Sequence, residues 1–131
     1  MTTPEPKSVP KHLRRFDVVR ALVYFEEHDG RRKERPMVII RLSGDGETGV
    51  GIKCTSNPTW SDREHGAVRI SQWQEAGLEH ETTARCRQLV RFRKSKLIGY
   101  YGRLDSVDIE AIAEALPQLK PEEFIWLSDE R

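Results

Sequence analysis

A strand–turn–strand pattern in residues 35–56 constrains the fold of this chain more than any other stretch. Residues 36–42 form a nearly continuous apolar run that is short enough for a buried strand, with a proline where a strand can begin. After a Gly-rich turn, apolar residues alternate with glycine and lysine over 49–54, as in a half-buried strand. The pattern predicts a β-hairpin that carries Arg35, before its first strand, and Thr55, after its second, to the same end of a sheet.

A guanidinium beside a hydroxyl is a natural receptor for a phosphodiester, because both groups donate hydrogen bonds to phosphate oxygens. Arg35 and Thr55 are therefore candidate site residues, with Ser56 adjacent to them. Both have structural alternatives. Arg35 can be a solvated charge in a basic loop, and Thr55 can be a strand-end hydroxyl in a turn.

The distribution of charge says more about partners than its total does. The 131 residues suffice for one domain with a modest core, and the formal net charge is only +1. Seven basic residues and no acid occupy positions 85–103, whereas eight acids accompany two basic residues from position 105 onward. This asymmetry predicts a surface that faces a polyanion on an otherwise neutral protein.

Short strands dominate the rest of the chain. The patterns predict strands at 17–25, 67–70, 83–93 and 97–104, polar loops at 26–35 and 57–65, a short helix at 71–77, a helix at 105–116 and a further helical turn at 121–127. We expect a mainly β fold, a small curled β-barrel or sheet with a helix packed on it. Residues 1–15 contain three prolines and little to bury, which predicts a flexible tail before a single domain at 16–131.

The expected strand at 83–93 has two different faces. One face carries Ala84, Cys86, Val90 and Phe92, and the other carries Arg85, Arg87, Arg91 and Arg93. The arginine face can follow an RNA backbone, dock an acidic protein, or simply be solvated. Gln88 and Leu89 interrupt the alternation, which predicts a bulge.

The short helix before this strand has recognisable ends. Ser71 and Gln74 fit a capping box, and Gly77 supplies a left-handed stop. Trp73 is then better explained as a core anchor than as a platform for base stacking. Trp60, in the second polar loop, is the better stacking candidate.

The two cysteines, Cys54 and Cys86, are widely spaced in apolar-alternating segments, so we interpret them as small core residues. The spacing favours neither zinc, even with His65 and His80, nor a disulfide. A Cys54 nucleophile acting with His65 lacks a supporting pattern. No apolar run is long enough to span a membrane, and the first ten residues lack the apolar core of a secretory signal, so we expect a cytoplasmic protein.

Several motifs occur together in one order. They are D-V-V…V-Y-F (17–25), R-P-M-V-I-I (35–40), I-K-C-T-S (52–56), W-Q-E-A-G-L (73–78), A-R-C-R-Q-L (84–89) and I-G-Y-Y-G-R-L-D-S-V-D (98–108). Together they resemble the MazF/PemK family of toxins from type II toxin–antitoxin systems, and especially its PemK-like branch. The resemblance implies an SH3-like barrel, usually a homodimer, that cuts single-stranded RNA at specific sequences and inhibits translation and growth. It implies no metal and no cofactor, and a cognate antitoxin as partner.

The resemblance also assigns roles to residues. It places the family's catalytic arginine at Arg35 and its hydroxyl residue at Thr55, which would stabilise the transition state when the ribose 2′-hydroxyl attacks the neighbouring phosphate. The products would be a 2′,3′-cyclic phosphate and a 5′-hydroxyl. The substrate-binding candidates are Ser56, Arg85, His28, Arg32, Trp60 and Arg87, and among them Arg85 matches an arginine that some members use. His28 matches a loop histidine of some members, although an exposed, solvated histidine is the alternative.

Two positions depart from the family pattern. Arg87 stands where the family has an acid, so the expected carboxylate base is missing and the general base is unassigned. Phe16 stands where the family has a glycine before the acid of the first strand. The change at Arg87 keeps a second hypothesis open, a non-catalytic SH3-like module that binds nucleic acid or protein.

Overall fold

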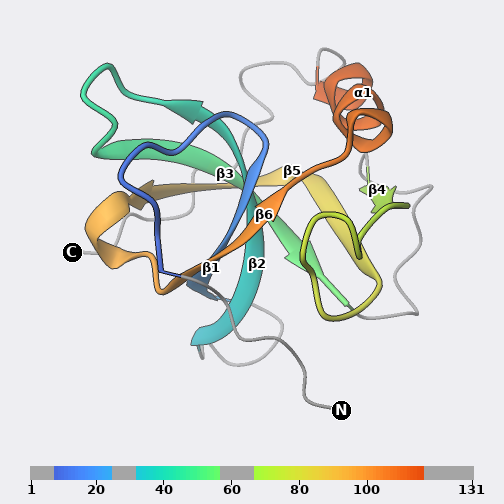
Figure 1. Cartoon of the computed structure of the whole chain (residues 1–131), viewed down its shortest axis with the longest axis horizontal. Helices are drawn as coiled ribbons and strands as arrows, with labels where there is room; N and C mark the ends of the chain where they lie inside the picture. Colours follow the sequence, from blue (N-terminus) through green and yellow to red (C-terminus); the bar gives the residue numbers. More distant parts are fainter. Residues whose placement is uncertain (1–7, 25–31, 57–66, 117–131) are drawn as a thin grey trace.

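The structure, a computed structural model, describes residues 8–24, 32–56 and 67–116. In this part of the chain, antiparallel strands form a 6-stranded curled sheet in the order β4-β5-β3-β2-β1-β6 (Figure 1). The elements are β1 (Asp17–Tyr24), β2 (Arg32–Leu42), β3 (Thr48–Thr55), β4 (Ala67–Ile70), β5 (Thr82–Arg93), the 3₁₀ turn η2 (Lys94–Lys96), β6 (Gly99–Arg103) and α1 (Ser106–Ala115). The prediction of a mainly β fold with a helix near the C-terminal end is confirmed.

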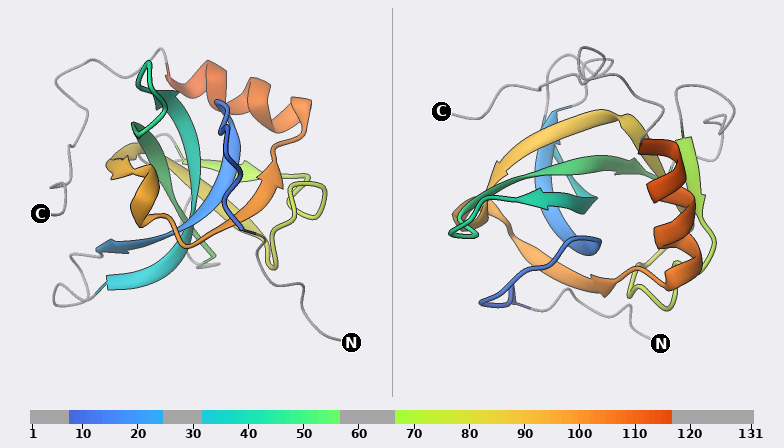
Figure 2. Two further views of the ribbon diagram at one scale, coloured as in Figure 1. Left: turned by 60° about the vertical axis from the view of Figure 1, so that its left-hand side comes forward. Right: turned by 90° about the horizontal axis from the view of Figure 1, so that it is seen from above.

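The sheet has two apolar faces. One cluster lies on the side that α1 covers, the helix-side face, and includes Val18, Val38, Ile52, Cys54, Leu89 and Ile112. A second cluster lies on the opposite face and contains Val19, Ala21, Met37, Ile39 and Phe92. Successive residues of a strand point to opposite sides, which is why Val18 and Val19 belong to different clusters. Figure 2 shows α1 lying across one side of the curled sheet.

A buried carboxylate fixes α1 to the rest of the fold. Asp108, in the first turn of α1, accepts hydrogen bonds from the backbone N–H of Ser71 at 2.8 Å, from its hydroxyl at 2.9 Å, and from the N–H of Gln72 at 2.8 Å. The hydroxyl of Ser71 therefore serves Asp108 instead of the predicted capping box. The N-cap of α1 is Asp105, whose side chain accepts from the N–H of Val107.

Residues 71–77 form consecutive turns rather than the predicted short helix. Their end is the predicted one, because Gly77 has a φ of 83°. The N–H of Leu78 donates to the carbonyl of Trp73 and that of Gly77 to the carbonyl of Gln74, both at 3.0 Å, the pair of bonds that terminates a helical turn at a left-handed glycine. A Cβ on Gly77 would lie 2.3 Å from the carbonyl oxygen of Tyr101, so the glycine also lets this turn approach β6.

A large bulge in β5 changes which side chains share a face. Ile52 of β3 pairs with Leu89, whereas Cys54 pairs with Ala84, so residues 85–88 stand opposite the single residue Lys53. The predicted bulge is confirmed, but its consequence was missed. The alternation of side chains between the two faces of the sheet is interrupted inside the bulge. Odd-numbered residues therefore point to one face before the bulge and to the other face after it.

The predicted continuous arginine face is consequently wrong. Arg91 and Arg93 pair with Val50 and Thr48 of β3, on the helix side of the sheet. Arg85 is the first residue of the bulge, still pairs with Ala67 of β4, and belongs to the opposite face. The apolar residues divide in the same way, with Ala84 and Cys86 in the helix-side cluster and Val90 and Phe92 in or against the other.

The strand predicted to begin at Pro36 begins earlier. β2 starts at Arg32, and Pro36 pairs with Arg20 of β1 inside the strand. β2 and β3 pair only from Met37 onward, so among the described strands β2 has a neighbour on one side alone at Pro36. A strand tolerates a residue without an N–H at such a position. Arg35 is therefore part of a strand and not of the predicted loop at 26–35.

Phe16, the predicted departure from a family glycine, has a φ of 73°. This left-handed conformation costs a residue with a Cβ about 1–2 kcal/mol. The Phe16 ring is buried in the helix-side cluster, with the Arg15 guanidinium carbon 4.8 Å from its centroid. Burial of the ring offsets the backbone strain.

The last part of the predicted N-terminal tail is fixed to the sheet. Leu13 packs against the opposite-face cluster, the Lys94 ammonium donates to the carbonyl of Lys11, and the N–H of Arg14 donates to Asp17 at 2.7 Å. The helical turn predicted at 121–127 and the loop at 57–65 lie outside the described residues.

Candidate functional site

The strands β2 and β3 separate at one end, and the candidate site lies where they separate. Their pairing ends at Met37 and Lys53. Beyond that pair β2 remains paired with β1, where Arg35 is opposite Ala21, while β3 remains paired with β5, where Thr55 is opposite Thr83. We call this divergence the fork. Arg35 and Thr55 each lie two residues past the last pair, so they flank the fork from either side and share the opposite face of the sheet.

The two flanking residues differ in their environments. Arg35 is half-buried, and its guanidinium donates to the carbonyl of Glu34 at 3.0 Å. Thr55 is buried, with 7 % of its surface exposed, at the end of β3. Its cross-strand partner Thr83 is also buried, and side chains opposed in this way are about 5 Å apart at Cβ.

Two buried cations complete the site. Arg85 lies on β5, two residues after Thr83, and is 7 % exposed. Lys53 lies on β3, two residues before Thr55, and is 3 % exposed. Both share the face of the fork, because residues two apart on a strand point to the same side. We call Arg35, Lys53, Thr55, Thr83 and Arg85 the basic cluster.

The basic cluster suits an anion with several oxygens. Its side chains are hydrogen-bond donors of two kinds, charged groups and hydroxyls. A phosphodiester between them would be stabilised by two directed hydrogen bonds from a guanidinium, a point charge from an ammonium, and single donors from the threonine hydroxyls.

The predicted site residues divide into three groups. Arg35, Thr55 and Arg85 lie on one face of neighbouring strands, and exposed Ser56 follows directly after β3. Arg32 begins β2 and Arg87 lies within the bulge of β5, and for these two only the backbone position is described. His28 and Trp60 lie outside the described residues.

Sequence reasoning missed Lys53 and Thr83. The signal was present, because in I-K-C-T the lysine and the threonine are two residues apart and must share a face. Lysine in an otherwise apolar strand was counted as the solvated half of an amphipathic pattern. The structure buries it.

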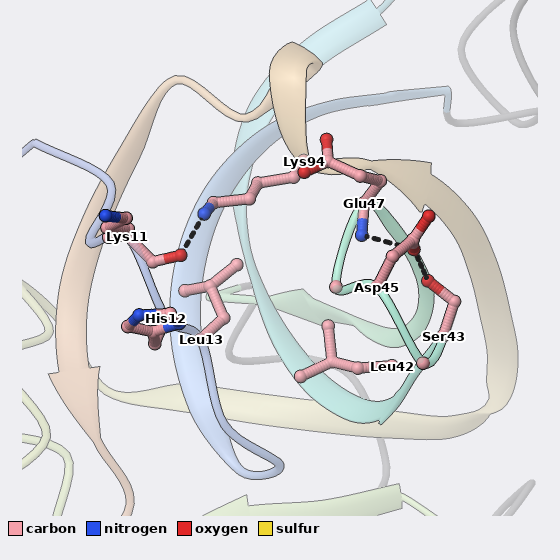
Figure 3. A pocket seen from close by; sticks show the side chains of 10 residues that line it. Lys11, His12, Leu13, Leu42, Ser43, Asp45, Glu47 and Lys94 are labelled. Atoms are coloured by element: carbon pink, nitrogen blue, oxygen red, sulfur yellow. Dashed lines mark hydrogen bonds between the residues drawn. The ribbon is translucent and has the colours of Figure 1, made fainter.

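A pocket among the described residues lies elsewhere. It has a volume of about 450 Å³ and is formed by residues 11–13, the β2–β3 turn and Lys94 (Figure 3). The turn joins β2 and β3 at the end opposite to the fork. Its polar groups bind one another, since Asp45 accepts from the Ser43 hydroxyl at 2.7 Å and from the Glu47 N–H at 3.0 Å. The residues that the sequence motifs single out, Arg35 and Thr55, lie at the other end of the sheet, so we place the candidate site at the fork.

The cysteines are core residues, as predicted. Cys54 and Cys86 are free thiols with no exposed surface, both in the helix-side cluster. Burial raises the pKa of the Cys54 thiol, with the nearby Cys86 adding to the effect, and burial raises the pKa of Cys86 to about 12. Neither thiol is available as a thiolate nucleophile at neutral pH, which removes the hypothesis of a Cys54 nucleophile.

Solved structures share this fold. A mycobacterial endoribonuclease in complex with its cognate antitoxin matches with a TM-score of 0.56 and 16% identity, over 79% of this chain and 90% of that chain. The Mycobacterium tuberculosis toxin MazF-mt6 matches with a TM-score of 0.54 and 16% identity, over 76% and 93%. At this identity the likeness establishes the class of fold. Comparison with curated proteins gives no match by sequence.

The sequence itself establishes the family. Residues 14–119 match the family model described as PemK-like, MazF-like toxin of type II toxin-antitoxin system. The chain belongs to this family, which confirms the resemblance inferred from its motifs. In the described part of the chain, no helix has the length and apolar character needed to cross a bilayer.

Proposed function

We propose that this protein is the toxin of a type II toxin–antitoxin pair and acts as an endoribonuclease that cuts single-stranded RNA at specific sequences without a metal. The observation that carries the proposal is the fork, which sets Arg35 and Thr55 on one face beside Arg85 in a chain of this toxin family. A domain over residues 16–131 would supply the site.

The reaction assigned to the fork is an internal transfer at phosphorus. The ribose 2′-oxygen loses its proton and bonds to the adjacent phosphorus, the bond from phosphorus to the 5′-oxygen breaks, and the 5′-oxygen gains a proton. Negative charge accumulates on the non-bridging oxygens, where Arg35 donates paired hydrogen bonds and Thr55 donates one more. Arg85 and Ser56 hold the flanking backbone.

The proton transfers belong to residues other than Arg87. Arginine remains protonated in proteins, so Arg87 cannot replace the family's carboxylate as a base. β1 ends at Tyr24 and β2 begins at Arg32, and His28 falls between them in the sequence. A histidine changes its charge near neutral pH, so His28 is the proposed proton carrier. Arg32 and Trp60 are proposed to contact the RNA strand, the tryptophan by stacking on a base.

The proposed partners follow from the same family. A mycobacterial endoribonuclease with this fold was solved with its cognate antitoxin, and we assign to this chain an antitoxin of its own and a homodimeric state. The proposed RNA substrate places it in the cytoplasm. Membership in a family of toxins argues against the second hypothesis, a non-catalytic binding module.

The test is cleavage of a long single-stranded RNA in buffer with EDTA, followed by mapping of the product ends. We expect cuts at one short sequence, with 2′,3′-cyclic phosphate on one fragment and 5′-hydroxyl on the other. Loss of cleavage in EDTA, or products with a 5′-phosphate, would contradict the proposed mechanism. Intact RNA at all protein concentrations would contradict the activity.

A further inference from the structure

Arg69 of β4 is an exposed arginine that the proposed reaction has not used. It pairs with Thr83 of β5, and Thr83 pairs in turn with Thr55 of β3. Arg69 therefore stands in one row of cross-strand neighbours with the hydroxyl residue of the fork. β4 is the first strand in the order of the described sheet, so this row runs from the fork to the edge of that sheet.

The other residue of the fork begins the same row. The last pair of β2 and β3 is Met37 with Lys53. Two residues further along each antiparallel strand, Arg35 stands across the fork from Thr55. We call this line of side chains the fork row. From β2 to β4 its members are Arg35, Thr55, Thr83 and Arg69, so an arginine lies at each end and two hydroxyl residues lie between.

The neighbouring row shows on which face Arg69 lies. Cys54, Ala84 and Val68 pair across β3, β5 and β4 in the same way, and all three lie in the helix-side cluster or pack against it. Each of them is adjacent in sequence to a member of the fork row. Because successive residues of a strand point to opposite faces, Arg69 points to the face that carries the fork.

Arginines of other strands have partners within the fold. Arg20 of β1 forms an ion pair with Glu34 at 2.6 Å, and Arg103 of β6 donates to the carbonyl of Arg15 at 2.6 Å. Arg69 differs, since within residues 8–24, 32–56 and 67–116 its guanidinium forms no ion pair and no hydrogen bond. An anion bound by Arg69 would therefore break no contact of the described fold.

The spacing of the fork row suits a second phosphate of the same RNA strand. Side chains directly opposed on neighbouring strands are about 5 Å apart at Cβ, so Arg69 begins about 10 Å from Thr55. A guanidinium there lies beside the site of the reaction rather than within it. Contacts of this kind position a nucleic acid strand without reading its sequence.

We propose that Arg69 is a substrate-binding residue whose guanidinium binds a phosphate next to the scissile phosphate of the RNA. This inference rests on the proposed function, because it takes RNA to be the anion. It adds a path to that function. The RNA strand crosses β3, β5 and β4 along the fork row and leaves the site over the edge formed by β4, held by paired hydrogen bonds from arginine at both ends of the row.

The first test compares R69M with the wild-type protein and with R41M, which removes an exposed arginine of β2 near the turn. The probe is a fluorescent single-stranded 2′-O-methyl oligonucleotide, which binds but cannot be cut because its 2′-hydroxyls are blocked. Affinity is measured by anisotropy over a range of salt concentrations. Removal of one phosphate contact should lower the slope of log K against log salt concentration by about 0.7 for R69M, and R41M should keep the wild-type slope.

The second test locates the contact along the RNA. The cut linkage is first mapped on unblocked RNA, and single linkages of the matching blocked probe are then replaced by an uncharged methylphosphonate. Replacement of one linkage next to the cut should weaken binding by the wild type and should have no further effect in R69M, because the two changes remove the same contact.

The melting temperature separates binding from folding. R69M should melt at the wild-type temperature, since its guanidinium holds no described contact. A clearly lower melting temperature would assign Arg69 to the fold, and a wild-type salt slope in R69M would leave it as a charge that protects the edge of the sheet. Binding without cleavage by the wild type would contradict only the proposed reaction, whereas a wild type that does not bind the probe would contradict both proposals.

Discussion

The two ends of the β2–β3 pair carry different kinds of polar group. At the turn, donors and acceptors are matched: the Ser43 hydroxyl and the Glu47 N–H both donate to Asp45, and the N–H of Ser43 donates to the carbonyl of Thr48 at 2.9 Å. At the fork, cations of three strands gather on one face with two hydroxyls between them. The first arrangement stabilises the hairpin. The second arrangement is the one proposed to bind the phosphodiester of RNA.

The contrast predicts different responses to substitutions at the two ends. A substitution at the turn should change the free energy of unfolding and leave RNA cleavage alone. A substitution at the fork should do the reverse. A protein in which both ends respond in the same way would show that the distinction is wrong.

The largest effect is expected for R35A, which removes the guanidinium from the fork. Loss of one transition-state donor lowers the rate by about 10²- to 10³-fold in comparable sites, and the melting temperature should change little because Arg35 is only half-buried. R41A, which removes an exposed arginine near the turn from the same strand, is the matched control. Equal rates of RNA cleavage by R35A and the wild type would show that the catalytic site does not lie at the fork.

A stability effect without a catalytic one is expected for Gly49→Ala, near the turn. A Cβ at Gly49 would lie 2.4 Å from the carbonyl oxygen of Arg41 and 2.7 Å from the ring of Phe92, so the strand or the ring must move. Such overpacking costs about 1–3 kcal/mol, measurable by urea unfolding. Gly44→Ala is the control, since nothing lies within 4 Å of its Cβ position. Impaired cleavage at equal folded fraction in G49A would mean that the two ends are coupled.

A smaller effect should appear on acidification. The pKa of Asp45 is lowered, first by the backbone hydrogen bond from Glu47 and then by the Ser43 hydroxyl. A carboxylate with a depressed pKa in the folded state adds stability above its unfolded pKa, near 3.8, and this stability disappears as the pH falls through the folded value. The melting temperature of D45N should therefore fall less than that of the wild type between pH 5 and pH 2. If the melting temperatures of D45N and the wild type fell equally with pH, the Asp45 carboxylate would not stabilise the turn.

The last prediction is that the two cysteine thiols of the native protein do not react with a thiol reagent. Cys54 precedes Thr55 directly, but its thiol points to the helix side and burial raises its pKa. A thiol reagent added to the native protein at pH 8 should label neither cysteine, and labelling should require denaturant. Fast modification of the native protein would show that the helix-side face opens, and that the two faces at the fork are less distinct than the strand register indicates.

Local patterns predicted the β-hairpin, the bulge, α1 and the stop at Gly77, because each depends on residues close in sequence. The glycine expected at position 16 was informative too, since Phe16 has the left-handed backbone that favours glycine. The arginine face was predicted wrongly, because the number of residues in a bulge is set by the partner strand. Without that number, Arg85 cannot be assigned to a face relative to Arg91.

The buried position of Lys53 was beyond sequence reasoning for a different reason. Alternation places it with Thr55, but it does not say whether that face is in water. The neighbours of Lys53 in the sheet come from β2 and β5, which contribute Met37 and the Arg85 bulge from distant parts of the chain. The roles of His28, Arg32, Trp60 and Arg87 remain predictions.

The pairing of β1 with β6 bears on how the protein is made. Asp17 pairs with Arg103, and the N–H of Leu104 donates to the carbonyl of Phe16. During synthesis β1 therefore cannot complete its pairing until β6 has left the ribosome. Contacts so distant in sequence form slowly, and domains generally fold as units during synthesis. A nascent chain that stalls before residue 99 already contains every residue of the basic cluster but lacks the strand that completes the sheet. Activity should therefore appear only when translation of the chain is nearly complete.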